Sequence, residues 1–394
     1  MDGIKNGGET DVDCGGPDKG TPRCALDQAC LVANDCAAKH CAANKCAILA
    51  PSCKGSAGTV SCGLASDENC CTTLPVPGGS YNRFADANYP ATVSSFKLDR
   101  FEITVGRIRE FFNAKGGNLR GNPPAPGAGA HPLIANSGWR STFNVRLPGS
   151  FAEIDDRLGA AGCTVGGDNS DGGAATWTPM PGPYESLPIT CIDWYTLFAF
   201  CEWDGGRLPT DAEWGYAAMG GSEQRLYAWS QLGDLSMNLT WGVHNDFVAA
   251  SLWDPVDQVF KFSVGTPFRT TDPITGKTND GPAHMATPGT KKGYGKWGQA
   301  DLTGNVLEYL LDRAPFEPGN CVDCALVDWP DPPQDQPGAY PPQWYTPNTN
   351  QSPDGYRSVR GGSWDPTHVP YTHYYYAYAV PRTYYAAGGR CARN

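Results

Sequence analysis

The most regular pattern of apolar and polar positions lies between residues 187 and 221. After Asp193, apolar residues recur at helical spacing, which predicts a helix with one apolar stripe. This stripe consists of Trp194, Leu197, Phe198 and Cys201. Asp193 is expected to cap the start of this helix, and Gly205-Gly206 to end it.

A second short helix is predicted to follow at once. Thr210 and Glu213 have the spacing of a capping box, in which each side chain binds the backbone amide of the other residue. Trp214 and Ala217 are expected to point inward, and Gly220-Gly221 to end the helix. Two short helices of this kind need a hydrophobic partner from the rest of the chain.

A strand and a third helix are predicted upstream. Residues 92–104 alternate between apolar and polar positions and are expected to form one strand. Thr104 can cap the helix that follows, and Gly116-Gly117 can end it. Its buried stripe is predicted to consist of Val105, Ile108, Phe111 and Phe112.

Long stretches at 117–185 and 222–300 show no clear period and are predicted to be mostly loop. The composition agrees, because 48 Gly and 34 Pro accompany only 18% charged residues. With 12 Trp and 18 Tyr, the core is expected to be aromatic. The net charge of −11 and the lack of a Lys/Arg block argue against nucleic-acid binding. No apolar run reaches about 20 residues, so no transmembrane segment is predicted.

Cysteines divide the chain into regions. Ten of the 16 cysteines precede residue 72, in a polar segment too poor in apolar residues to form a core. We therefore predict a disulfide-stapled module or stalk at 1–71, a linker at 72–79 and a large domain at 80–394. Zinc is the less favoured alternative, because no CxxC pairs with a second CxxC.

This cysteine usage indicates an oxidising compartment, so the protein is expected to be extracytoplasmic, with a leader or lipid-anchor segment upstream of Met1. The opening DGIKNGGETDVDCGG resembles short cysteine-rich modules of exported bacterial proteins. Its oxygen-bearing side chains fit either a calcium loop or, as we favour, a solvated acidic turn. They belong to Asp2, Asn6, Glu9, Asp11 and Asp13. Further along, a Cys163–Cys191 bridge is expected to tie a surface excursion, and Cys321 and Cys324 to close a small loop.

Six motifs follow one another within residues 75–394, namely FEITVGRIREFF, PITCIDW with FCEW, GGRLPTDAEWGYAA, DLTGNVLEY, VRGGSW and GGRCAR. Together they resemble the formylglycine-generating enzyme family, also called the sulfatase-modifying factor family. The resemblance implies an α+β variant of the C-type lectin fold with little regular secondary structure. It also implies a disulfide between Cys201 and Cys391.

The resemblance further implies a structural calcium ion in the DLTGNVLEY segment. Its ligands would be Asp301, Gly304, Val306 and Glu308, whose alternation lets carbonyls and side chains of one extended segment face one ion. The alternative is a plain turn with Glu308 in a surface ion pair. A weaker second calcium site would involve Asn238 and Leu239, with Asp280 downstream.

The copper chemistry of the family lacks its ligands here. Enzymes of the family bind copper(I) through two cysteines, three and eight residues after the Ser of GGS, and oxidise the cysteine of a Cys-x-Pro-x-Arg motif to an aldehyde. Ser363 is present, but those two positions hold Pro366 and Tyr371. No cysteine lies between Cys324 and Cys391. Copper and formylglycine formation are therefore not expected.

The residues after Ser363 support two classes of function. In the first, the protein is a non-catalytic binding or scaffold protein for a protein, peptide or glycan, with an aromatic binding surface. That surface would contain Asp365, His368, Tyr371, His373, Tyr374 and Tyr376.

In the second, it is a metal-dependent oxidoreductase acting on a thiol or protein substrate through a rebuilt iron or copper site. Asp365, His368 and His373 would supply the metal ligands, and Ser363, His368, Tyr371 and His373 are the catalytic candidates. A third, weaker reading makes the aromatic segment a diversified ligand-binding region.

Overall fold

The computed structural model describes residues 3–394 with interruptions. Outside the described backbone lie 17–20, 26–27, 32–34, 37–40, 43, 47–49, 54–55, 160–162, 164–174, 231–250, 255–258, 263–270, 275, 277–280, 315–318, 328–355, 365–371, 373–374 and 380–384. The α-helices of the described part are α1 (Val105–Ala114), α2 (Phe151–Leu158), α3 (Trp194–Trp203) and α4 (Asp211–Ala218).

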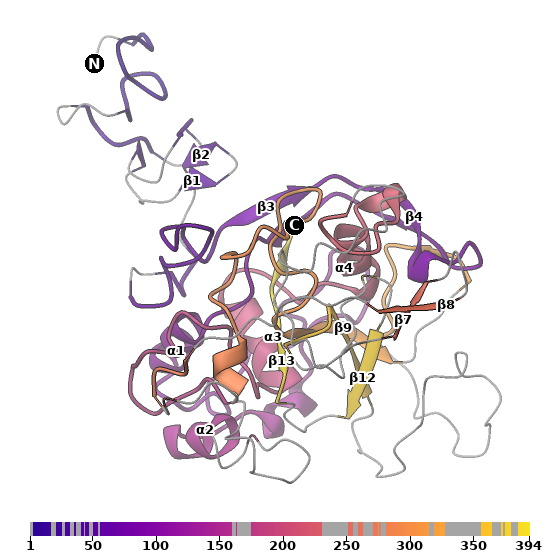
Figure 1. The fold of residues 1–394 in the computed structure, drawn as a ribbon. Coiled ribbons are helices and arrows are strands. Elements are labelled where there is room, and N and C mark those ends of the chain that lie inside the picture. Colours follow the sequence, from indigo (N-terminus) through magenta and orange to yellow (C-terminus); the bar gives the residue numbers. More distant parts are fainter. Residues whose placement is uncertain are drawn as a thin grey trace.

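Short strands form several small sheets in the described part (Figure 1). One contains β12 (Tyr375–Ala379), β11 (Tyr356–Arg360), β9 (Leu307–Ala314) and β13 (Ala387–Gly388). Another contains β14 (Ala392–Arg393), β6 (Phe96–Asp99) and β3 (Thr73–Val76). A third contains β10 (Cys321–Val322), β5 (Pro90–Val93) and β4 (Gly79–Asn82). The pairs are β7 (Ser251–Asp254) with β8 (Val259–Phe262), and β1 (Cys41–Ala42) with β2 (Lys45–Cys46). The α+β class and the low content of regular structure are confirmed.

Three predicted helix starts are confirmed in atomic detail. Thr104 accepts a hydrogen bond from the amide of Arg107 at the start of α1, and Asp193 accepts one from Thr196 at the start of α3. At the start of α4, Thr210 and Glu213 form the complete capping box. Each cap satisfies a backbone donor that the helix itself leaves unpaired.

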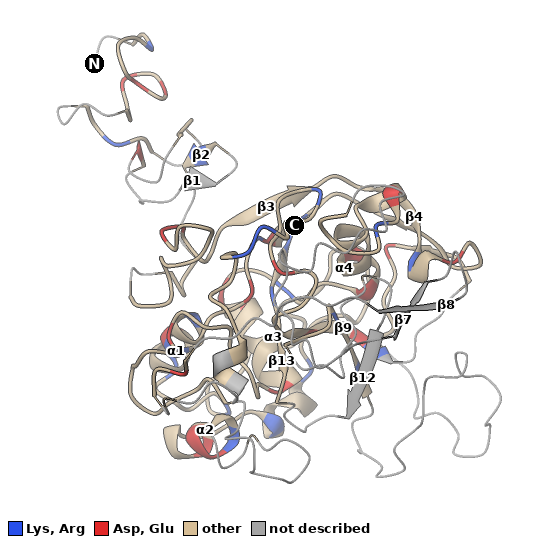
Figure 2. Ribbon diagram, viewed as in Figure 1, with Lys and Arg blue, Asp and Glu red and all other residues tan. Residues whose placement is uncertain are grey.

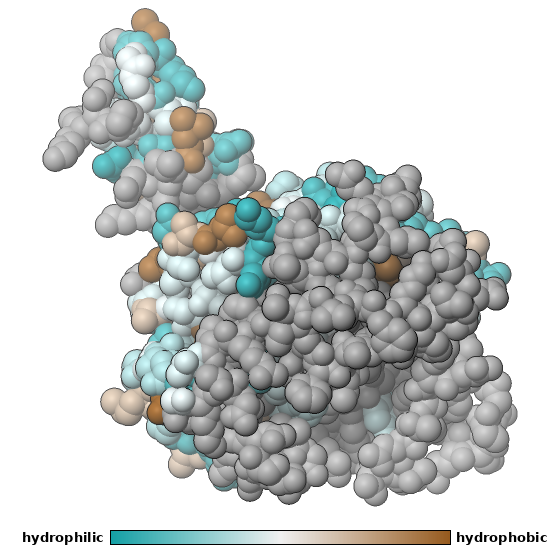
Figure 3. Space-filling view, viewed as in Figure 1, coloured by the Kyte–Doolittle hydropathy of each residue, from teal (hydrophilic) through white to brown (hydrophobic). Residues whose placement is uncertain are grey.

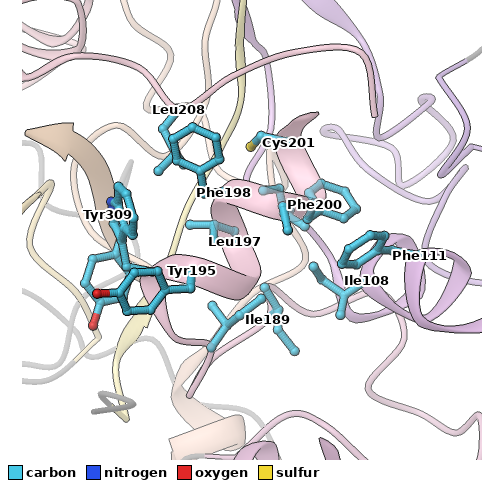
Figure 4. Close-up of a cluster of buried hydrophobic side chains, with 14 of the residues drawn as sticks. Ile108, Phe111, Ile189, Tyr195, Leu197, Phe198, Phe200, Cys201, Leu208 and Tyr309 are labelled. Carbon is cyan, nitrogen blue, oxygen red and sulfur yellow. The ribbon is translucent and has the colours of Figure 1, made fainter. Parts of the chain in front are cut away.

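Helix α3 is buried all round, rather than along one stripe as its sequence pattern predicted. Every side chain from Trp194 to Cys201 is buried. α3 lies against α1 and the 3-10 helix η3 (Ser141–Arg146) and also against β9. Apolar residues from these elements fill a common core around α3 (Figure 4). A helix with neighbours on several sides must be apolar on all of them.

Strand β9 separates this core from a second one. Tyr309 and Leu311 belong to the α3 core, whereas Leu310 packs in a second core with Trp214 of α4. Side chains of a strand point alternately to its two faces, so one strand serves both helices. α3 and α4 therefore cover opposite faces of the sheet that contains β9 and β11.

The strand predicted at 92–104 is wrong in its extent. The chain instead forms β5 and β6, which belong to different sheets. The break falls at two serines: Ser94 donates from its amide and hydroxyl to Asp323, and Ser95 accepts from the amide of Gly78. These side-chain bonds replace ladder bonds and let the strand change sheets.

Residues 117–185 contain more structure than their sequence pattern indicated. The 3-10 helix η3 and helix α2 lie within this stretch. Ser150 caps α2 by accepting from the amide of Glu153, but only Ile154 and Leu158 of the helix are buried. The prediction missed this helix although Phe151, Ile154 and Leu158 recur at helical spacing after the Ser150 cap.

The expected boundary between module and domain moves towards the N-terminus. Thr73–Val76, expected within the linker, is strand β3 and pairs with β6 along its whole length. Residues 52–71 also join the large domain, because the amide of Ser52 donates to Asp204 and Arg107 donates to Ser52 Oγ and the Cys70 carbonyl. The part before residue 50 stands away from the main body (Figure 1).

Disulfides stabilise both parts of the chain. The predicted bridges Cys201–Cys391, Cys163–Cys191 and Cys321–Cys324 are all confirmed. Near the N-terminus the described bridges are Cys14–Cys24, Cys36–Cys46, Cys53–Cys71 and Cys62–Cys70. Among the described residues of the N-terminal part, the buried hydrophobic cluster consists of cysteines, while the side chains of Ile4 and Leu31 are exposed. Figure 3 shows separate hydrophobic spots on the surface of this part. Disulfides thus replace a hydrophobic core there, as expected.

The surface agrees with the charge analysis. Lys and Arg are scattered rather than gathered in one stripe in the view of Figure 2. Within the described residues, no helix is both long and apolar enough to cross a membrane.

Candidate functional site

The candidate site begins where β11 ends, at the turn Gly361-Gly362-Ser363-Trp364. Gly361 and Gly362 have backbone φ angles of 97° and 70°, which residues with a Cβ atom rarely adopt. The amide of Gly304 donates to the Gly361 carbonyl, and the amide of Trp364 donates to the Asn305 carbonyl. The turn that carries Ser363 is therefore fixed to the turn of the DLTGNVLEY segment.

Trp364 forms an aromatic cluster with residues from two other segments. Its ring is stacked on His284, with centroids 5.8 Å apart, and meets the edge of Tyr385 at 6.0 Å. The Cys163–Cys191 bridge and Met285 belong to the same buried cluster. Trp364 Nε1 is buried and has no hydrogen-bond partner in the described part of the chain.

His284 and Tyr385 were not predicted as site residues. His284 lies in the 3-10 helix η7 (Gly281–His284), within a loop that has no apolar period. Its only sequence signal was its type, one of six histidines in the chain. Ser363, which was predicted, lies beside Trp364 and is buried, with 1% of its surface exposed.

Most of the predicted binding surface lies outside the described residues. This applies to Asp365, His368, Tyr371, His373 and Tyr374. Tyr376 belongs to β12, which pairs with β11, but its side chain is not described. The weaker calcium ligands Asn238 and Leu239, with Asp280, also lie outside the described residues. These assignments remain predictions.

Thr372, within the segment that follows Ser363, belongs to the described residues. It is fully buried, and its amide and hydroxyl donate to the carbonyls of Leu226 and Arg225. Its own carbonyl accepts from Arg360 Nη1 at 3.3 Å. Arg360 in turn forms an ion pair with Asp211 at 2.6 Å. A buried ion pair thus connects the segment after Ser363 to the start of α4.

The predicted calcium ligands lie in a buried cluster of acidic side chains. Glu308 accepts from Arg390 through both oxygens, at 2.6 and 2.7 Å, and from Trp214 Nε1 at 2.9 Å. Asp301 accepts from the amide of Gly289 at 2.6 Å. The alternative of an exposed ion pair for Glu308 is wrong, because Glu308 and Arg390 are completely buried.

Glu102 is an additional carboxylate that the sequence analysis missed. It accepts hydrogen bonds from the Asn305 side chain and from the amide of Val306. Burial raises the pKa of Glu102 well above its usual value, and the charges of Asp301 and Glu308 add to this rise. Burial likewise raises the pKa of Asp301 to about 6.

The calcium ion that the family resemblance implies for this cluster remains a prediction. Glu102, Asp301 and Glu308 together carry three negative charges when ionised, and Arg390 compensates one of them. A divalent cation with oxygen ligands would compensate the remaining two. Asp301 and the carbonyls of Gly304 and Val306 would hold it, and Glu308 would share its oxygens with Arg390.

Cysteine sulfurs offer no metal site in the described part. The only group of three or more His, Cys, Asp or Glu side chains there whose ligand atoms lie within 4.8 Å of one another is Cys30, Cys36 and Cys46. All three are disulfide-bonded, so none is the thiolate that a soft metal ion requires. Of the cysteines with described side chains, none is free.

Comparison with known proteins gives several relatives. The formylglycine-generating enzyme of Streptomyces coelicolor is 31% identical over 276 residues, which cover 64% of this chain and 72% of that protein. The mouse formylglycine-generating enzyme is 39% identical over 61 residues, or 14% of this chain and 16% of that protein. This chain therefore spans about a sixth of the mouse relative. Mouse "Inactive C-alpha-formylglycine-generating enzyme 2" is 38% identical over 178 residues, covering 39% of this chain and 49% of that protein.

Among solved structures, PvdO from Pseudomonas aeruginosa aligns with 82% of this chain and 94% of its own, at 14% identity and a TM-score of 0.41. The family described as "Sulfatase-modifying factor enzyme 1-like domain" matches residues 62–394, which include the described part of the candidate site. The chain therefore belongs to the sulfatase-modifying factor family.

Proposed function

We propose that this protein is an exported binding or scaffold protein that recognises a protein, peptide or glycan and does not form formylglycine. One observation carries the proposal: Pro366 and Tyr371 occupy the two positions where the copper-binding cysteines are expected. The disulfide state of the other cysteines supports it, since no free thiol exists among the described side chains to replace that pair. Without two thiolates, the soft ligand set that selects copper(I) is missing.

The surroundings of Ser363 suit binding. Trp364, His284 and Tyr385 form an aromatic cluster next to a segment with seven tyrosines between Tyr371 and Tyr385. Aromatic side chains with a polar end contribute much contact area at a small cost in conformational entropy. One relative described above is named as an inactive formylglycine-generating enzyme, so similarity to this family is compatible with a protein that does not form formylglycine.

Calcium would have a structural role in this proposal. Held by Asp301, Gly304, Val306 and Glu308, it would offset the negative charge of the buried cluster and stiffen the turn to which Ser363 is bound. Export agrees with the disulfides in both parts of the chain.

Metal analysis of the full chain, purified without chelator, tests the proposal. We expect about one calcium ion or more per chain and no stoichiometric copper or iron, even after incubation with copper(I). Stoichiometric iron or copper that is lost in the His373→Ala variant would contradict the proposal and favour the rebuilt oxidoreductase site. Asp67→Asn, at an exposed position, is a control that should leave the metal content unchanged.

A further inference from the structure

A short disulfide-bonded segment lies against the large domain just before β3. We call it the strap; it runs from residue 52 to residue 71, and the structure describes 52–53 and 56–71 of it. Two bridges, Cys53–Cys71 and Cys62–Cys70, close the strap on itself. Because each bridge joins two strap residues, the bridges fix the shape of the strap but add no covalent link to another part of the domain.

The strap has little apolar surface of its own with which to hold the domain. Among its described side chains, the buried hydrophobic ones are the four cysteines. Val60 and Leu64 are 45% and 52% exposed. The Cys62–Cys70 bridge packs in a small cluster with Phe101. The apolar contact between strap and domain is therefore made by the bridges themselves, as in small disulfide-rich modules.

Both ends of the strap contact Arg107 of α1, whose side chain is fully buried. The amide of Ser52 donates to Asp204 at 2.9 Å, and Ser52 Oγ accepts from Arg107 Nε at 3.0 Å. At the other end, the Cys70 carbonyl accepts from Arg107 Nη1 at 3.2 Å. Detachment of the strap would therefore remove two hydrogen-bond partners of Arg107.

The middle of the strap contacts the domain through its backbone. The carbonyl of Gly58 accepts from the hydroxyl of Thr104, the residue that caps α1. The amide of Gly63 donates to the Pro288 carbonyl at 2.9 Å. Backbone contacts of this kind require one particular loop shape, and a disulfide lowers the entropy cost of keeping that shape.

We propose that the strap is a redox-sensitive element, which stays attached while its two bridges are intact and detaches when a dithiol reduces them. Each reduction transfers two electrons and two protons from the dithiol to one S–S bond, which gives two cysteine thiols and converts the dithiol to a disulfide. The detached strap uncovers Arg107, while α3 and α4 stay folded on their apolar cores. The device is independent of the function proposed above.

The order in which the bridges are reduced tests the proposal. The full chain is treated with increasing dithiothreitol without denaturant, alkylated and analysed by mass spectrometry. Cys62 and Cys70 should react at lower dithiothreitol concentrations than Cys201 and Cys391, whose bridge lies in the core around α3. The proposal is overturned if Cys62 and Cys70 stay oxidised until Cys201 and Cys391 are reduced.

Serine variants test the attachment without a reductant. In the variant that combines Cys62→Ser with Cys70→Ser, hydrogen exchange of residues 56–71 should accelerate about tenfold or more, with α4 unchanged. The matched control combines Cys14→Ser with Cys24→Ser, because that bridge spans 10 residues instead of 8 and lies in the part that stands away from the main body (Figure 1). The control should leave exchange of the strap unchanged.

Two results of the exchange experiment would overturn the proposal. Unchanged exchange of residues 56–71 in the variant without the Cys62–Cys70 bridge would show that the bridge does not hold the strap in place. Equal loss of protection in the strap and in α4 would show that the whole domain unfolds, so that the strap is not a separately detachable element.

Discussion

Buried arginines have different partners at the two ends of helix α3. At its C-terminal end, Asp204 and Asp99 contact Arg107 and Arg393, so two carboxylates balance two guanidinium groups. At its N-terminal end, Arg357 lies on Trp194 with no carboxylate partner among the described residues. The first cluster joins segments through ion pairs, whereas Arg357 is held by the face of Trp194 and by the Leu311 carbonyl.

The balanced end also carries the longest disulfide, and its removal should have the largest effect. Cys201–Cys391 joins residues 190 positions apart, whereas Cys321–Cys324 joins residues 3 apart. In the chain-entropy model, removing the first costs about 5 kcal/mol and removing the second about 1.5 kcal/mol. Urea denaturation of the two double-alanine variants measures both. Equal losses would mean that the long bridge is not a principal constraint on this fold.

Breaking the balanced cluster should be almost as costly. Asp204→Ala leaves Arg107 and Arg393 without one of their carboxylates, and we expect a loss of about 3–5 kcal/mol in the free energy of unfolding. Glu68→Ala is the control, since its pair with Arg100 is partly exposed and should contribute about 1 kcal/mol or less. A loss below that of the control would contradict the structural role of the cluster.

Calcium removal tests the buried cluster of Glu102, Asp301 and Glu308. At a free calcium concentration 100 times its Kd, bound calcium stabilises the fold by about 2.7 kcal/mol, which a chelator should remove. Asp301→Asn should respond less to the chelator than the unmodified protein. Thermal unfolding with and without EDTA measures this. An unmodified protein that unfolds at the same temperature in both conditions would exclude a stabilising calcium ion.

Asp312 supplies a smaller, pH-dependent test. Burial raises its pKa from 3.8 to about 8, and the neighbouring charge of Asp211 adds to this rise. Between about pH 4 and pH 8 the folded state keeps a proton that the unfolded chain releases, so stability should fall as pH rises and level off above 8. The slope reaches about 1.4 kcal/mol per pH unit at most. Denaturation across this range should show a flatter profile for Asp312→Asn, whereas Asp67→Asn should keep the original slope.

Local chemistry explains which parts of this fold the sequence could predict. The caps at Thr104, Asp193 and Thr210 depend on partners within three residues, so they were predictable. The bridge Cys201–Cys391 followed from the family resemblance, because spacing alone does not fix disulfide pairing. The split between β5 and β6 was missed because Ser94 binds Asp323, which lies 229 residues away.

The sites were less predictable than the fold for the same reason. Glu102 joins Asn305 across 203 residues, and His284 meets Trp364 from another segment. In the sequence, Arg357 has the pattern of an exposed polar residue of a strand, whereas in the structure it is packed against Trp194. Long-range pairs of this kind leave no period in the sequence.

A peptide oxidation assay tests the central claim of this account most directly. The full chain, supplied with copper(I) and oxygen, is incubated with a peptide containing Cys-x-Pro-x-Arg, and mass spectrometry monitors conversion of the thiol to an aldehyde. A variant that combines Pro366→Cys with Tyr371→Cys restores the two missing thiols and serves as a comparison for copper binding. We predict no aldehyde from the unmodified chain. If the unmodified chain forms the aldehyde and the His373→Ala variant does not, the result would contradict the claim that this protein binds its partner without oxidising it.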